Sequence, residues 1–195
     1  MIITDVGSTK GSVIDMAKKV FGKWPENFIP AHPIAGKEKN SVRASDALLF
    51  KNKRVILTPS PNAVNKSIEI VQDMWQQTGA LLEVMDYQQH DKLLALTSHL
   101  PHILAYALID DLIENTPNAF DYTAGGFKDF SRIASSDSIM WRDICLNNSA
   151  EIVIQIKQYQ QSLNKLLDFI KNKNSEKLEK TFNRAKQQRD NHFNN

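Results

Sequence analysis

The sequence predicts an α/β fold that changes to an all-helical region near residue 86. Up to that point, short strand-like apolar segments alternate with segments whose apolar residues have helical spacing, and beyond it only helical spacing remains. Strands that are apolar on both faces and alternate with helices are typical of a parallel sheet covered by helices. The chain has 195 residues, 42% of them hydrophobic and 24% charged, which is enough for such a fold and its core.

The first half is predicted to begin on a strand, because Ile2, Ile3 and Val6 precede a Gly-Ser turn. The expected elements of this half are, in order, a strand at 2–6, a helix at 13–21, strands at 27–32 and 54–60, a helix at 62–78 and a strand at 80–86. With so few strands, we expect a partial sheet with one exposed edge.

Only helices are predicted after residue 86. Apolar residues between Tyr87 and Ile113 recur at intervals of three and four, which indicates one long helix that Pro101 interrupts. Turn-forming residues around a Gly-Gly pair predict a loop after it. The further helices are expected at 127–134, 138–146, 149–172 and 175–190. The change of period therefore divides the chain into domains 1–86 and 87–195.

Charge and composition argue against several classes of protein. Residues 171–195 carry a net charge of +4, but their spacing is that of a solvated helix face without an aromatic platform, so we expect no nucleic-acid partner. No window approaches the ~18 uninterrupted apolar residues of a membrane helix, and the first residues lack a targeting pattern. The single cysteine, Cys145, cannot form an internal disulfide, which fits a reducing compartment. We expect a cytoplasmic protein without a membrane partner.

His32 is the first candidate for a catalytic side chain. It ends the predicted strand 27–32 and precedes a glycine-containing loop, so we expect it at the carboxyl end of the sheet, where open α/β folds bind ligands. A loop histidine that is hydrogen-bonded only to the backbone would have the same sequence context.

His99 and His102 lie three residues apart and therefore on one face of the long helix. This spacing suits zinc or iron, and with the nearby His90-Asp91 pair it permits a metal-dependent hydrolase. That interpretation needs a further acidic ligand, and none has a fitting position, so we expect no metal. The alternative is an ordinary polar contact with one histidine pointing into a cleft. Pro101 between them predicts a kink.

Arg132 and Lys128 are four residues apart, with Asp129 between them. The planar guanidinium of arginine suits a carboxylate ligand, which it holds through two parallel hydrogen bonds. The alternative is a solvent-exposed helix with paired charges.

Several segments, in their order and spacing, resemble the prephenate dehydrogenase family, which includes the related arogenate dehydrogenases. They are DVGSTKG (5–11), HPIAGKEKN (32–40), VILTPS (55–60), HDKLLALTSHLPH (90–102), GGFKDFSRIASSD (125–137) and IMWRDI (139–144). The resemblance covers essentially the whole chain. It implies that 1–86 is part of a Rossmann-like nucleotide-binding domain and that 87–195 is a helical substrate-binding domain through which a homodimer forms.

The resemblance also implies roles for individual residues. In such enzymes the histidine of HPIAG, here His32, takes the proton of the substrate's ring hydroxyl. The serine of DVGSTKG, here Ser8, lies with Gly7 beside the nicotinamide and takes part in catalysis, as does His99, which orients the substrate. Arg132 binds a substrate carboxylate. The other residues implied at the substrate site are Lys128, Asp129, Glu38 and Trp141, the last from the same subunit or across a dimer.

The function implied is the oxidative decarboxylation of prephenate or arogenate, with hydride transfer to NAD or NADP, in tyrosine biosynthesis. Formation of an aromatic ring drives the reaction, so the protein has to supply a base, a cation for the carboxylate and an aligned cofactor. The sequence contains no G-x-G-x-x-G turn for a pyrophosphate. In the family this turn lies upstream of the Ser8 segment, so we expect a truncated form with weak NAD(P) binding. The alternative is a catalytically incompetent fragment that acts only as a helical dimerisation or ligand-binding module.

Overall fold

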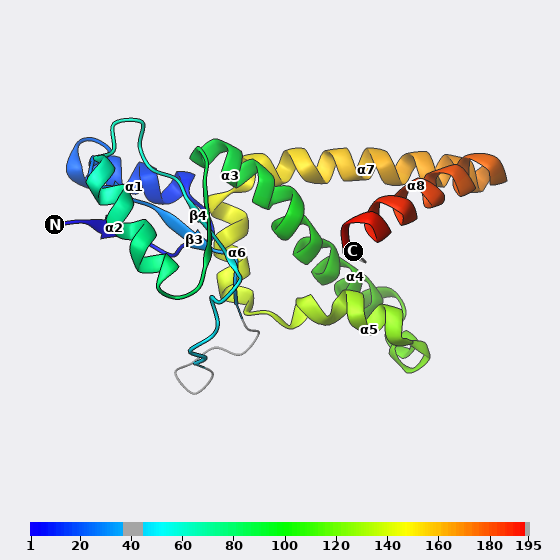
Figure 1. Ribbon diagram of the computed structural model, residues 1–195. Coiled ribbons are helices and arrows are strands. Elements are labelled where there is room, and N and C mark those ends of the chain that lie inside the picture. Colours follow the sequence, from blue (N-terminus) through cyan, green and yellow to red (C-terminus); the bar gives the residue numbers. More distant parts are fainter. Residues whose placement is uncertain (37–44, 194–195) are drawn as a thin grey trace. The chain divides into compact units, whose positions relative to one another are not determined.

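The structure is a computed structural model that describes residues 1–36 and 45–193 (Figure 1). Glu38 lies outside the described residues, so its expected place at the substrate site has no structural counterpart here. The chain forms two compact units, Met1–Ile152 and Val153–Asn195, each of which is described by itself.

The strands of the first unit form two small sheets. In one, β1 (Ile3–Thr4) pairs in parallel with β2 (Phe28–Ile29). In the other, β4 (Arg54–Leu57) pairs in parallel with β5 (Leu81–Val84) and antiparallel with β3 (Ala31–Pro33). These strands and the helical remainder confirm the predicted fold class: a partial, parallel-containing Rossmann-like sheet followed by helices.

The sheet differs from the expectation at Pro30, because 27–32 is not one strand. Proline has no amide hydrogen and cannot donate to a neighbouring strand, so β2 ends before it and β3 begins after it. The carbonyl of Pro30 accepts a hydrogen bond from the Thr58 amide at 2.9 Å. The chain thereby passes from one sheet to the other and places His32 opposite Ile56 in an antiparallel pair.

Two helices pack on the strands of this unit, α1 (Gly11–Phe21) and α2 (Asn65–Gln76) (Figure 1). Val71 and Trp75 of α2 are buried in the core. The other buried members of that core are Ile29, Ala31, Val55, Leu57 and Ala80. Burial of each large apolar side chain stabilises the fold by roughly 1.5–3 kcal/mol. This core holds β3 and β4 rigidly beside one another.

The predicted long helix is present, and its interruption takes a specific form. Its parts are α3 (Tyr87–Leu94), a π-helical turn η2 (Ala95–His99) and α4 (Leu100–Asn115). Pro101 cannot donate to the carbonyl of Thr97, and the amide of Leu100 bonds five residues back to Ala95. The extra residue in this turn changes which side chains face the same direction before and after it.

The stretch Tyr87–Asn115 is also long and apolar enough, by length and composition alone, to cross a membrane. The sequence criterion of an uninterrupted apolar run missed it, because uncharged polar residues such as Thr97 and Ser98 interrupt the run without adding charge. Core helices of soluble proteins pass the same test. The absence of a membrane partner therefore stays a prediction.

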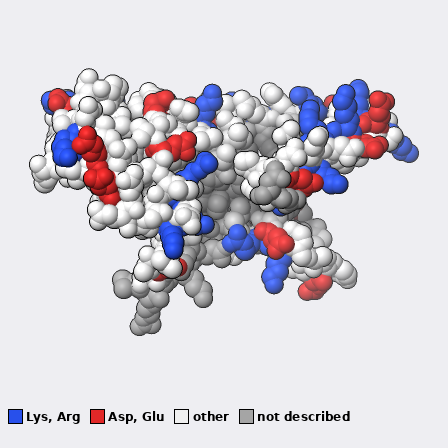
Figure 2. All heavy atoms as spheres, viewed as in Figure 1, with Lys and Arg blue, Asp and Glu red and all other residues white. Residues whose placement is uncertain are grey.

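The remaining elements follow the sequence closely. They are η3 (Pro117–Tyr122), α5 (Gly125–Ser131), η4 (Arg132–Ser135), α6 (Ser138–Asn147), α7 (Ser149–Lys171) and α8 (Ser175–Phe193). The predicted helix 127–134 begins earlier, on the glycine pair, and tightens into a 3₁₀ turn at Arg132. The side chain of Asp137 caps α6 by accepting the Met140 amide at 2.8 Å. Figure 2 shows Lys and Arg beside Asp and Glu over α7 and α8, as expected of solvated helix faces.

Candidate active site

A cavity of about 760 Å³ lies in the first unit, at the ends of its strands. Polar and aromatic side chains in its wall include Ser8, His32, Ser98, His102, Arg132 and Trp141. They come from the loop after β1, from β3, from the long helix and from the η4–α6 region. Pockets of this volume suit a small organic ligand. The structure therefore brings Ser8, His32, Arg132 and Trp141 together, as the sequence predicts.

His32 lies on β3 with only one of its ring nitrogens engaged by the protein in a described contact. Its Nδ1 is 2.9 Å from Nε2 of His90, and the two rings meet edge to face with centroids 5.1 Å apart. Burial, followed by the nearby His90, Lys10 and His99, lowers the pKa of His32 to about 3. The ring is therefore neutral at physiological pH and keeps one unprotonated nitrogen.

His90 and Asp91 lie behind His32, at the buried side of the site. His90 is 0% exposed, and its Nδ1 is 2.8 Å from Oδ1 of Asp91. The Asp91 carboxylate also accepts the backbone amides of Lys10 at 2.8 Å and Gly11 at 2.7 Å, where α1 begins. Burial alone raises the pKa of Asp91, but the hydrogen bonds from His90, Lys10 and Gly11 together lower it below its ordinary value. Asp91 is thus a buried carboxylate that stays ionised.

Lys10 ties the loop that carries Ser8 to the strand that carries His32. It is 0% exposed, and its Nζ donates to Asp5 Oδ2 at 2.5 Å and to the carbonyl of Ala31 at 2.7 Å. Burial lowers the pKa of Lys10, although the contact with Asp5 opposes this effect. A buried ion pair of this kind fixes geometry more than it adds stability.

Gly7 has a different part from the cofactor contact that the sequence predicts. Its amide donates to Asp5 Oδ2 at 2.9 Å, and a Cβ atom at this position would lie 3.0 Å from that oxygen. A glycine is therefore needed for the loop to close around Asp5. The Gly7 amide hydrogen is used inside the protein, and its neighbours Val6 and Ser8 line the cavity.

His99 does not lie where the sequence predicts, because the π-helical turn directs it inward. It is 1% exposed, its Nδ1 is 3.2 Å from Nδ2 of Asn148, and it is absent from the cavity wall formed by the described residues. Asn148 also donates to the backbone carbonyl of Asp91 at 2.8 Å. Burial lowers the pKa of His99 to about 4. We therefore replace His99 by His102 as the cavity histidine of the long helix.

His102 and Trp141 form an aromatic wall of the cavity. Their rings are nearly parallel, 18° apart in plane, with centroids 3.7 Å apart. Nδ1 of His102 is 2.9 Å from the Ser98 carbonyl, so this nitrogen donates and Nε2 is left for a ligand. Trp141 lines this cavity within the same chain as His32.

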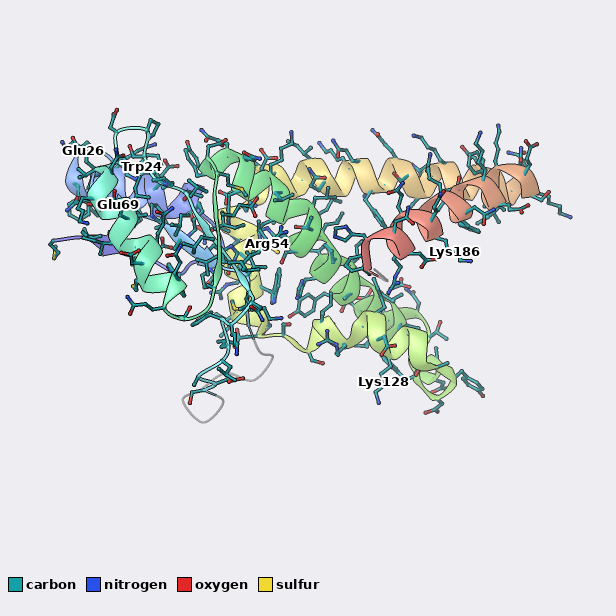
Figure 3. All side chains as sticks on the ribbon, in the orientation of Figure 1. Trp24, Glu26, Arg54, Glu69, Lys128 and Lys186 are labelled. Carbon is teal, nitrogen blue, oxygen red and sulfur yellow. The ribbon has the colours of Figure 1, made fainter. Side chains whose placement is uncertain are left out.

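The charged residues of α5 and η4 are divided between two cavities. Arg132 is exposed and borders both the larger cavity and a second one of about 380 Å³. Lys128 and Asp129 line the second cavity, and Figure 3 shows Lys128 on the outer side of α5. Their expected place around the entrance of the His32 cavity is therefore not observed among the described residues.

Sequence reasoning missed the roles of Lys10, His90, Asp91 and Asn148. The adjacent His90 and Asp91 were noticed only as metal ligands, and the described residues contain no group of three or more His, Cys, Asp or Glu side chains that could hold a metal ion. The available signal was an ionisable pair at the buried start of an apolar helix. Cys145 is a free thiol whose pKa is raised by burial.

Comparison with known proteins agrees with this geometry. Residues 1–84 match the family described as "Prephenate dehydrogenase, nucleotide-binding domain", and residues 86–184 match "Prephenate dehydrogenase, dimerization domain". The first match ends at residue 84 and the second begins at residue 86.

Individual relatives give the same result. The prephenate dehydrogenase of Bacillus subtilis is 36% identical over 193 residues, which are 97% of this chain and 52% of the relative. The cyclohexadienyl dehydrogenase of Zymomonas mobilis is 36% identical over 195 residues, 97% of this chain and 65% of the relative.

A solved structure of prephenate dehydrogenase from Aquifex aeolicus, in complex with hydroxyphenyl propionate and NAD+, superimposes with a TM-score of 0.89 at 40% identity. The superposition covers 96% of this chain and 66% of that one. The chain thus spans about half to two thirds of the length of these relatives. Fold, site geometry and both family matches agree that the chain belongs to the prephenate dehydrogenase family.

Proposed function

We propose that this chain carries out the oxidative decarboxylation of prephenate or arogenate, with hydride transfer to NAD or NADP, in the formation of tyrosine. The observation that carries the proposal is the neutral, partly buried His32 in a cavity that also contains Arg132 and an aromatic wall. The names of the relatives support the same reaction. A purely structural helical module has less support, because it would not need this assembled polar site.

The reaction needs a base that begins and ends neutral. The substrate's ring hydroxyl gives its proton to Nε2 of His32 while hydride leaves the carbon that bears the hydroxyl. The ring carboxylate then leaves as carbon dioxide, and its bonding electrons complete the aromatic ring. The proton returns from His32 to the ring oxygen, so no net proton is gained or lost. A neutral histidine suits this shuttle, because its unprotonated nitrogen accepts the proton and the lowered pKa of His32 favours its return.

Arg132 and the aromatic wall bind the substrate in this proposal. The guanidinium of Arg132 pairs with a substrate carboxylate through parallel hydrogen bonds. The stacked rings of His102 and Trp141 offer an apolar surface to the six-membered ring, and Nε2 of His102 offers a further polar contact. Lys128 and Asp129 lie farther along α5, and their proposed part is limited to the charge around Arg132.

NAD(P), when bound, supplies the hydride acceptor. Ser8 fits the nicotinamide end of such a cofactor, because it follows β1 at the carboxyl end of the sheet and lines the same cavity as His32. We propose residues 1–86 as part of the nucleotide-binding domain and 87–195 as the substrate-binding and dimerisation domain.

A homodimer and a cytoplasmic location belong to the same proposal. The match of residues 86–184 to a dimerisation domain supports the dimer. Exposed leucines of the helical half add support: Leu93 and Leu96 in the first unit, and Leu163 and Leu167 in the second, are each 42–51% exposed. Light scattering should give twice the 22.1 kDa of one chain, and a single-chain mass at micromolar concentration would refute the dimer.

Two measurements test the activity. The chain is incubated with NAD+ or NADP+ and with prephenate or arogenate, and both the reduced nicotinamide and carbon dioxide are measured. The same assay is run on the chain fused to the preceding segment of the Aquifex aeolicus relative, because that relative is longer. We expect equal amounts of the two products with at least one substrate. Failure of both forms to turn over, together with no calorimetric binding of hydroxyphenyl propionate, would refute the proposal.

A further inference from the structure

A continuous line of hydrogen bonds runs from the buried start of α1 to the cavity. It passes from the Asp91 carboxylate through the His90 ring to His32, over contacts of 2.8 and 2.9 Å. Of these three residues, only His32 touches the substrate in the proposed reaction. We propose that Asp91 and His90 are positioning residues that hold the hydrogen of neutral His32 on Nδ1, so that the lone pair of Nε2 faces the substrate.

The first step of the argument is the charge of Asp91. Two backbone amides and the His90 ring donate to its carboxylate, and an ionised carboxylate can only accept. Nδ1 of His90 therefore carries the hydrogen. The other tautomer would place an unprotonated ring nitrogen 2.8 Å from a carboxylate oxygen, where two lone pairs repel.

The second step shows how the tautomer of His90 determines the tautomer of His32. With its hydrogen on Nδ1, neutral His90 presents a lone pair at Nε2, which is 2.9 Å from Nδ1 of His32. Nδ1 of His32 must donate to it. His90 is 0% exposed, so water does not compete for this contact. The remaining nitrogen of His32, Nε2, is then the unprotonated one, as a base requires.

The third step concerns the moment at which His32 holds the substrate proton. Its positive charge then faces Lys10 from the start of α1, His90 from α3 and His99 from η2, each of which disfavours that charge. Only Asp91, behind His90, favours that charge among these neighbours. The line to Asp91 therefore stabilises the transient imidazolium while burial and Lys10 return the proton to the ring oxygen.

The arrangement also links the base to the cofactor side of the cavity. Asp91 accepts the amides of Lys10 and Gly11, which lie two and three residues after Ser8 in the chain. Moving α1 would therefore disturb both Ser8 and the tautomer of His32. This inference rests on the proposed function for its consequence in turnover, but the tautomer itself is a property of the chain without ligand.

The test is ¹⁵N NMR of the histidine rings in the 195-residue chain at neutral pH, with the exposed His192 as internal reference. We expect hydrogen on Nδ1 and none on Nε2 for both His32 and His90. In His90→Phe the acceptor is lost, and the hydrogen of His32 should move to Nε2. His90→Gln keeps an acceptor oxygen and should retain the wild-type tautomer. In Asp91→Asn the amide oxygen can still accept from the Lys10 amide and from Nδ1 of His90, so both rings should keep the wild-type tautomer.

If a variant fails to fold, the tautomer of His32 in the unsubstituted chain still tests the proposal. Hydrogen on Nε2 of His32 in that chain overturns the proposal. So does a His32 tautomer that is unchanged in the folded His90→Phe variant. Where turnover is measured, His90→Phe should lower kcat by about 10²-fold or more with little change in KM, and His90→Gln should recover most of it.

Binding of hydroxyphenyl propionate to the same samples separates the two proposals. The expected tautomer without ligand binding would support the positioning role and count against the proposed function. Binding of hydroxyphenyl propionate together with the opposite tautomer of His32 would support the proposed function and count against the positioning role.

Discussion

The His32 cluster and the charged segment of α5 and η4 reach the larger cavity through His32 and Arg132, and they are built differently. Behind His32, the residues Lys10, His90 and Asp91 are at most 7% exposed, and protein groups satisfy their side chains. Arg132 and Lys128, in contrast, are exposed. The groups proposed for the chemistry are thus held by protein contacts before a ligand arrives, whereas the groups proposed for its carboxylates are open to water.

This difference predicts where substitutions act. Changes in the buried cluster should affect the rate of the chemical step or the stability of the fold, because an unpaired polar group is strongly destabilised in a low-dielectric interior. Changes in the exposed segment should affect binding by smaller amounts, because water replaces the lost contacts and screens the charges.

The largest effect is expected for His32→Asn. Asparagine keeps much of the shape but has no basic nitrogen, so kcat should fall by about 10²–10⁴-fold while KM changes little. Steady-state kinetics of the active form measure this, with His192→Asn as a control at an exposed position. A variant with the wild-type kcat would show that the proton goes to another group, of which His102 is the nearest candidate in the cavity.

Acid should destabilise the fold through the buried histidines. The pKa values of His32 and His99 are lowered to about 3 and about 4, so between these values and about 6.5 the unfolded chain binds more protons than the folded one. The stabilisation is complete above pH 6.5 and declines as the pH falls. Each histidine should cost on the order of 2 kcal/mol at pH 5.

Urea unfolding at pH 7 and pH 5 measures this loss. His99→Gln should make the decline with pH shallower, whereas His192→Gln should leave it unchanged. An equal decline in all three chains would show that neither buried ring is responsible.

A smaller effect is expected for Arg132→Gln. Loss of a charge-assisted contact at an exposed position should raise KM by about tenfold and leave kcat nearly unchanged. Lys128→Gln is the matched control, one turn away on the same segment but lining only the second cavity, and should change KM less than twofold. A larger KM effect for Lys128→Gln than for Arg132→Gln would show that Lys128, and not Arg132, contributes more to substrate binding.

Periodicity predicted most elements of the fold, because local residue patterns determine them. The segments 54–60 and 80–86 contain β4 and β5, and the C-terminal helices lie where helical spacing places them. Pro30 is the exception: its missing donor divides one apolar run between two sheets, and a run of residues does not show which sheet its parts join. The antiparallel pairing of β3 follows from that division.

The site was predictable only where position along the chain determines it. His32 reaches the cavity because it ends a strand, which sequence shows directly. His99 was expected in the site from the family resemblance alone, and the structure places it in the interior beside Asn148. The contact of Asp91 with Lys10 spans 81 residues and leaves no local pattern.

The pH dependence of kcat/KM tests most directly whether His32 acts as a buried neutral base. The ordinary pKa of histidine would give a decline with a midpoint near ~6.5. The site lowers the pKa of His32 to about 3, so kcat/KM should stay level from pH 8 down to about pH 5 under conditions in which the chain remains folded. A decline through pH 6.5 that disappears in His32→Asn would contradict the neutral, buried state of His32.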